Sequence, residues 1–167
     1  MEKISRIMIG LNLVLLLGYI NYSIFKKEKQ LHDGRLVLLR LAPADPRSLM
    51  QGDYMELRYD LSDLEWDDTM PKRGYCILTK DTLNVVNILR VQLTPVPLNE
   101  GEFLLKFTAG KRGINLGAES YFFEEGTAEI YENARYGGLI IDEEGNSLLY
   151  GLFNENYVLL HKNTENE

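Results

Sequence analysis

The first pattern along the chain is an uninterrupted apolar stretch. It begins at Ile7 and ends at Phe25, and its nineteen positions hold no charged side chain. A helix needs roughly 20 apolar residues to cross a bilayer. Apolar side chains lie on all sides of such a helix, which suits lipid better than a single core face. With basic residues on both flanks, residues 1–29 are expected to form an uncleaved membrane anchor.

A cleaved signal peptide is the rival interpretation of this segment. Its cleavage site needs small residues in an A-x-A pattern, which residues 19–23 lack. Lys3 and Arg6 favour an amino terminus inside the cell, whereas the lysines at 26, 27 and 29 favour the reverse. We expect a single pass through the cytoplasmic membrane, with the remaining residues, 30–167, on the extracytoplasmic side.

Beyond the anchor, the pattern changes to short stretches of alternating apolar and polar positions, typical of strands. Expected strands are residues 35–41, 54–61, 74–79, 85–93, 103–108, 114–123, 139–142 and 147–153, with an edge strand at 157–161. Residues 35–41 are apolar on both faces, which predicts a central strand. In residues 103–108, Phe103, Leu105 and Phe107 should point inward, and Leu104 and Lys106 outward.

One soluble helix is expected at residues 128–136. Thr127 is its predicted cap, and the glycines at 137 and 138 are expected to end it. Together these elements predict a mainly β (α+β) fold: a transmembrane helix, then a compact antiparallel β barrel or sandwich with one or two short helices.

The stretch from Asp45 to Tyr59 is predicted to combine a turn with a strand. Asp45 can cap a short helical turn, Pro46 fits its first position, and Gly52 can end it. From Tyr54 onward the side chains alternate, so that Met55, Leu57, Tyr59 and Leu61 point inward and Tyr54, Glu56, Arg58 and Asp60 outward.

Charge and composition exclude several classes of function. The formal net charge is −7; residues 1–29 contribute +3, so the remainder carries −10 and should repel nucleic acid. The single Cys76 lies in an apolar run, which indicates a buried, inert thiol. One cysteine and two distant histidines leave no zinc-ligand spacing, and the acidic residues between 63 and 68 lack the pattern of a calcium loop. No metal or cofactor is predicted.

Residues 52–59, Gly-Asp-Tyr-x-x-Leu-x-Tyr, resemble the bacterial GDYXXLXY protein family, which is named for this motif. The resemblance extends upstream to residues 41–47 and resumes at residues 117–126. It implies an envelope-facing domain behind a membrane helix, often beside a multi-pass membrane protein. The family has no established activity, so the resemblance implies no reaction.

These two segments supply the candidate binding residues: Arg47, Asp53, Tyr54, Glu119, Tyr121 and Glu125. The competing interpretation is structural, with Arg47 paired to Asp53 or Glu125. Leu57 and Tyr59 are predicted core residues. Gly52 and Gly126 are predicted to be needed for their backbone conformation, which other residues adopt less readily. No catalytic residue is assigned.

Two catalytic alternatives stay open. Ser48, with Lys72 or Lys80 as base, would resemble a signal-peptidase-like serine hydrolase, although its spacing to Gly52 departs from those enzymes. Glu119 and Glu125 would form an acid–base pair if they shared a cleft. The favoured prediction is a non-catalytic binding or accessory domain for a membrane-protein partner or an envelope ligand.

Overall fold

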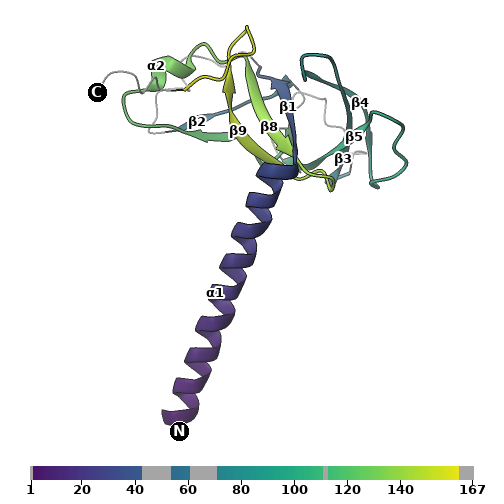
Figure 1. The fold of residues 1–167 in the computed structure, drawn as a ribbon. Helices are drawn as coiled ribbons and strands as arrows, with labels where there is room; N and C mark the ends of the chain where they lie inside the picture. The colour runs from purple at the N-terminus through teal and green to yellow at the C-terminus, as the bar shows by residue number, and fades with distance from the viewer. Residues whose placement is uncertain (1, 43–53, 61–70, 111–112, 162–167) are drawn as a thin grey trace. The chain divides into compact units, whose positions relative to one another are not determined.

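The computed structural model describes residues 2–42, 54–60, 71–110 and 113–161 (Figure 1). Contacts divide the chain into two units, residues 1–34 and residues 35–167. The predicted division at residue 29 falls inside a helix, and as a boundary between anchor and functional domain it stays a prediction.

Helix α1 (Glu2–Asp33) confirms the predicted amino-terminal apolar helix. From Ser5 to Asp33 it is long and apolar enough to cross a membrane, with a mean hydropathy of 1.8 in its most apolar window. None of that window is buried within the protein. The helix is therefore a candidate membrane span. A signal sequence near the amino terminus would have the same length and apolar character.

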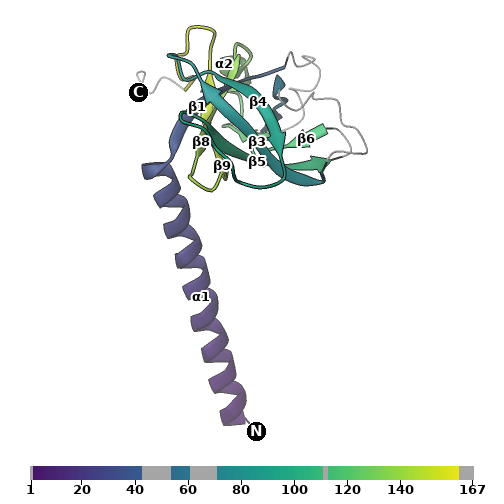
Figure 2. The same cartoon turned by 90° about the vertical axis from the view of Figure 1, so that its right-hand side faces the viewer.

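The described strands of the second unit form three antiparallel sheets (Figures 1 and 2). The first has the order β1 (Arg35–Arg40), β8 (Tyr136–Ile141), β9 (Ser147–Phe153). The second pairs β2 (Tyr54–Glu56) with β7 (Ser120–Phe122). The third has the order β4 (Val86–Gln92), β3 (Arg73–Lys80), β5 (Phe103–Gly110), β6 (Gly113–Asn115). A short helix, α2 (Ala128–Tyr131), follows β7. The predicted mainly β fold is confirmed in its sandwich-like form, since these strands do not close into a barrel.

The main apolar core joins the three sheets and α2. Its fully buried members include Leu39 on β1, Tyr59 after β2, Leu105 on β5 and Leu139 on β8. In β5 the inward positions Phe103, Leu105 and Phe107 are buried as the alternation predicted. Burying large apolar side chains from every sheet is the main stabilising contribution, at about 1.5–3 kcal/mol for each.

Leu104 corrects the prediction for the other face of β5, because this supposedly outward side chain is only 6% exposed. Its cross-strand partner Ile77, on β3, is fully buried as well. The turn of the β8–β9 hairpin reaches this side of β5, where the Lys106 amide donates to the carbonyl of Gly145 (2.8 Å). A period of two identifies the two faces of a strand but does not reveal that both are covered.

Strand β1 is correctly predicted to be buried on both faces but wrongly predicted to be central. Val37 and Leu39 enter the main core, while Leu38 packs with Val85 and Phe153 in a second cluster. In its sheet, β1 lies at the edge beside β8. Its other side meets the start of β4 through a single parallel bridge between Leu38 and Val85.

Helix α2 is shorter than predicted, because Tyr136 already begins strand β8. Gly137 and Gly138 lie inside that strand rather than at a helix end. An added Cβ at Gly137 would lie 2.7 Å from the Tyr59 ring, and one at Gly138 would clash with the Phe153 ring. These glycines therefore allow two aromatic rings to approach the backbone of β8. The hydroxyl of Thr127 does not cap the helix but donates to the carbonyl of Glu124 (2.6 Å).

Both predicted hairpins are confirmed. In the β3–β4 turn, Asp81 accepts hydrogen bonds from the backbone N–H groups of Leu83 and Val85. In the β8–β9 turn, Asp142 accepts them from Glu144 and Asn146. The predicted edge strand at residues 157–161 contributes only an isolated bridge between Phe153 and Leu159.

Candidate functional site

The two segments that carry the motif pair directly with each other, although residues 60–116 lie between them in the chain. Strand β2 pairs antiparallel with β7, with Tyr54 opposite Phe122 and Met55 opposite Tyr121. The ladder continues as the Leu57 amide donates to the carbonyl of Glu119 (2.6 Å). We call this pair of strands the β2–β7 ribbon.

The inner face of the ribbon belongs to the core. Met55, Leu57 and Tyr59 are buried, which confirms the predicted alternation over the described part of this strand. The Tyr59 hydroxyl donates to the carbonyl of Ala118 (2.7 Å), so the motif's last tyrosine ties the ribbon to the segment before β7. Burial raises the pKa of Tyr59 above its ordinary value, and the charge of Glu119 adds to the shift.

Tyr121 lies on this inner face as well. It is half-buried, and its ring centroid lies 5.0 Å from that of Tyr131 on α2, at an edge-to-face angle of 68°. Burial raises its pKa, and a hydrogen bond with Tyr131 acts in the same direction. Tyr121 therefore helps to pack α2 against the ribbon.

The outer face of the ribbon carries an exposed aromatic pair. Tyr54 is 46% exposed and Phe122 74% exposed. Their ring centroids are 5.8 Å apart, with the planes inclined by 39°. Beside them is a cavity of about 490 Å³, which is lined by Phe122, Phe123, Glu124, Thr127 and Tyr131. Exposed aromatic side chains beside a cavity suit contact with another molecule, because they bury a large area at little conformational cost.

The four predicted candidates that the structure describes, Tyr54, Glu119, Tyr121 and Glu125, lie apart from one another. Tyr54 and Tyr121 occupy opposite faces of the ribbon. One carboxylate oxygen of Glu119 accepts hydrogen bonds from the backbone N–H groups of Leu116 and Gly117. Glu119 therefore stabilises the loop before β7. Glu125 is exposed in the turn that follows β7. A shared acid–base role for the two glutamates therefore has no support in this arrangement.

Several predicted residues lie outside the described residues: Asp45, Pro46, Arg47, Ser48, Gly52 and Asp53, as well as the acidic segment at 63–68. Their assigned roles stay predictions. Gly126 is described and has φ = +81°, a conformation that glycine adopts at low cost.

Phe122 is the exposed residue that the sequence analysis missed. The signal was present: in the run Ser-Tyr-Phe-Phe at 120–123, inward placement of Tyr121 and Phe123 forces Phe122 outward. Aromatic residues are ordinarily assigned to a core, and only the pairing with Tyr54 shows that this one lies on the surface.

The described residues lend no support to catalysis. Lys72 is exposed, and the exposed Lys80 donates to the side-chain oxygen of Asn84 (2.7 Å). Cys76 is fully buried, as predicted, and burial raises its thiol pKa to about 12, which suppresses the reactive thiolate. In the described part of the chain, no group of three or more His, Cys, Asp or Glu side chains is placed to hold a metal ion.

Comparison with protein families decides the relationship. The model of the GDYXXLXY protein family matches residues 16–152, which is most of the chain. The chain belongs to this family. The match spans the end of the apolar stretch, both motif segments and the strands between them, and it confirms the resemblance found in the sequence. Comparisons with curated proteins and with solved structures returned no match.

Proposed function

We propose that this chain is a membrane-anchored accessory protein that performs no catalysis. Helix α1 holds it in the cytoplasmic membrane in a single pass. Its β-rich domain, outside the cytoplasm, binds a membrane-protein partner through the outer face of the β2–β7 ribbon.

The observation that carries the proposal is the exposed pair of Tyr54 and Phe122. The motif pattern specifies tyrosine at position 54, as it specifies Leu57 and Tyr59. Folding accounts for Leu57 and Tyr59, because both are buried in the core. It does not account for Tyr54, which contributes its ring to the surface. An aromatic anchor at such a place is typical of interfaces, where a few large side chains supply most of the binding energy.

A tethered domain also fits a partner in the same membrane. Anchoring confines both proteins to one surface and raises their effective concentration, so that a small contact area is sufficient. The multi-pass neighbour that the family resemblance implies would meet this description. The hydrolase alternative is not proposed, because no described residue supports its serine–lysine pair.

Site-specific photo-cross-linking of the full chain in intact membranes tests the interaction. We expect Phe122→p-benzoylphenylalanine to form one discrete adduct with a membrane protein, identified by mass spectrometry. Adding Tyr54→Arg should reduce that adduct more than fivefold. Tyr150→p-benzoylphenylalanine is the matched control, since Tyr150 is 51% exposed on β9, outside the ribbon. Equal adducts from both positions, or adducts with lipid alone, would contradict the proposal.

The proposed topology has its own test. Protease added outside intact spheroplasts should digest the domain beyond about residue 29. Complete protection of the domain until the cells are lysed would place it in the cytoplasm. Release of a soluble domain without any protease would indicate cleavage instead of anchoring.

A further inference from the structure

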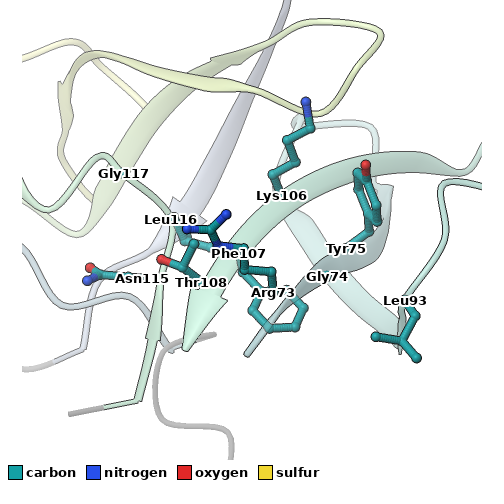
Figure 3. A pocket seen from close by; sticks show the side chains of 10 residues that line it. All are labelled: Arg73, Gly74, Tyr75, Leu93, Lys106, Phe107, Thr108, Asn115, Leu116 and Gly117. Atoms are coloured by element: carbon teal, nitrogen blue, oxygen red, sulfur yellow. The ribbon is translucent and has the colours of Figure 1, made fainter. Parts of the chain in front are cut away.

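A second recess lies on the face of the four-stranded sheet that carries Tyr75 (Figure 3). The strand register places Arg73 of β3 opposite Thr108 of β5, which is opposite Asn115 of β6. In the next row, Tyr75 lies opposite Lys106. The recess has a volume of about 460 Å³ and is lined by Arg73, Gly74, Tyr75, Leu93, Lys106, Phe107, Thr108, Asn115, Leu116 and Gly117. We call it the sheet groove, and its size is within the usual range for small-ligand sites.

The charge of the sheet groove opposes that of the domain around it. Residues 30–167 carry a net charge of −10, yet the described residues that line the groove include two cations and no carboxylate. Clustered charge of one sign in a concave, partly apolar site raises the local concentration of oppositely charged ligands. A groove that is cationic inside an acidic domain is therefore electrostatically suited to an anion.

Arg73 has the capacity to bind such an anion. Among the described residues, no hydrogen bond or ion pair engages its side chain, and Figure 3 shows the guanidinium extended over the sheet toward Thr108 and Leu116. A guanidinium offers five N–H donors in a planar fork that matches a carboxylate or phosphate. The hydroxyls of Thr108 and Tyr75 are further donors on the same face.

The other polar groups at the groove are already engaged. Lys106 donates to the side-chain oxygen of Asn146 (2.8 Å) and lies 3.7 Å from the carboxylate of Glu144. With its amide turned to donate, Asn115 reaches Glu119 at 3.0 Å. Glu119 also accepts from two backbone N–H groups, so its charge is compensated locally. Arg73 is therefore the cation of this groove whose donors are not engaged by a described residue, whereas Glu144 partly cancels the charge of Lys106.

We propose that the sheet groove binds an organic anion, with a carboxylate or phosphate held by Arg73 and an apolar body lying along Leu93 and Tyr75. The apolar part follows from the lining, since these two side chains join the two cations. This site does not depend on the outer face of the β2–β7 ribbon, because the two surfaces share no residue. It adds a ligand to a domain proposed above to bind a protein.

Isothermal titration of the full chain in an uncharged detergent tests this site. The probes are 3-phenylpropionate, phenyl phosphate and the uncharged 3-phenylpropanamide. We expect saturable binding of at least one anion and at least tenfold weaker binding of the amide. A preference for 3-phenylpropionate would indicate a carboxylate ligand, such as a fatty acid or peptide end. A preference for phenyl phosphate would indicate a phosphate-bearing one, such as a lipid headgroup.

Three variants locate the site. Arg73→Gln should weaken anion binding at least tenfold, whereas Lys72→Gln, the same charge change at an exposed neighbour outside the lining, should change it less than twofold. Glu144→Gln should strengthen binding two- to threefold, because it frees the charge of Lys106. Equal losses in Arg73→Gln and Lys72→Gln, equal binding of the amide, or no saturable binding of either anion would overturn the proposal.

Discussion

Two tyrosines of one motif, Tyr54 and Tyr59, lie five residues apart and meet opposite environments. Tyr59 is fully buried, donates to the carbonyl of Ala118, and lies against the backbone of β8 at Gly137. Tyr54 is nearly half exposed and contacts Phe122 across the outer face of the β2–β7 ribbon. The odd spacing places them on opposite faces, because successive side chains of a strand alternate.

The difference separates the structural part of the motif from the part available for binding. Tyr59 joins the ribbon to the β1–β8–β9 sheet, so its removal should lower the free energy of unfolding. Tyr54 contributes little to the core, so its removal should weaken binding to the proposed partner and leave the free energy of unfolding almost unchanged. Unfolding of the full chain in an uncharged detergent measures the structural side of this contrast, and photo-cross-linking at Phe122 measures the binding side.

Tyr59→Ala should have the largest effect. Removing a large buried ring loses its burial energy and leaves a cavity, which typically costs about 3–5 kcal/mol. Chemical denaturation, followed by near-ultraviolet circular dichroism, should show this as a lower midpoint with an unchanged slope. A loss below about 1 kcal/mol would contradict the central position assigned to this ring.

Tyr59→Phe should cost less, about 1–3 kcal/mol, because it keeps the ring and leaves only the buried carbonyl of Ala118 without its donor. The variant should also change the response to alkali. Burial raises the pKa of Tyr59 in the folded protein above its ordinary value of 10.0. The unfolded chain therefore loses this proton first, so the stability from Tyr59 is complete below pH 10 and declines as pH rises above it.

Phenylalanine has no such proton, so the stability of the variant should decline less steeply between pH 10 and pH 11 than that of the wild type. The thiol of Cys76, whose pKa is raised from 9.0 to about 12, adds an alkaline decline of its own. Because it is present in both proteins, it cancels in the comparison. Identical slopes would show that the Tyr59 hydroxyl is not held in the apolar core.

Tyr54→Ala should have the smallest effect on stability, about 0.5 kcal/mol, because exposed substitutions away from the core seldom cost more. The same variant should reduce the photo-cross-linked adduct formed at Phe122 by more than fivefold. A loss of stability above about 2 kcal/mol would instead assign Tyr54 a structural role and remove the reason for proposing a binding face.

Local patterns were sufficient to predict the apolar helix, the faces of the motif segment and both hairpins. A helix that satisfies its own backbone can be recognised from the apolar run between Ile7 and Phe25, since no distant partner is required. Alternation placed Leu57 and Tyr59 inside and Tyr54 outside, because the period of a strand is independent of its neighbours. The two hairpins followed from short turns between apolar runs.

Glycine shows where such reasoning fails. A pair of glycines such as Gly137 and Gly138 is typical of a helix end. It is equally suited to a position where an aromatic ring from a distant segment contacts the backbone, and the neighbouring sequence does not distinguish the two. The ring of Tyr59 comes from the segment after β2, almost eighty positions earlier, and that of Phe153 from the next strand of the sheet. Both contacts depend on which strands become neighbours, and a local pattern does not contain that information.

The sequence by itself determined the apolar helix, the mainly β domain, the family and the face of each described residue between Tyr54 and Asp60. Only the tertiary structure decided that β2 pairs with β7, that Phe122 joins Tyr54 at the surface, and that Arg73 and Lys106 both line one groove. The physical reason is that periodicity arises from a single strand's own geometry, whereas pairing depends on burying apolar faces from segments far apart in the chain.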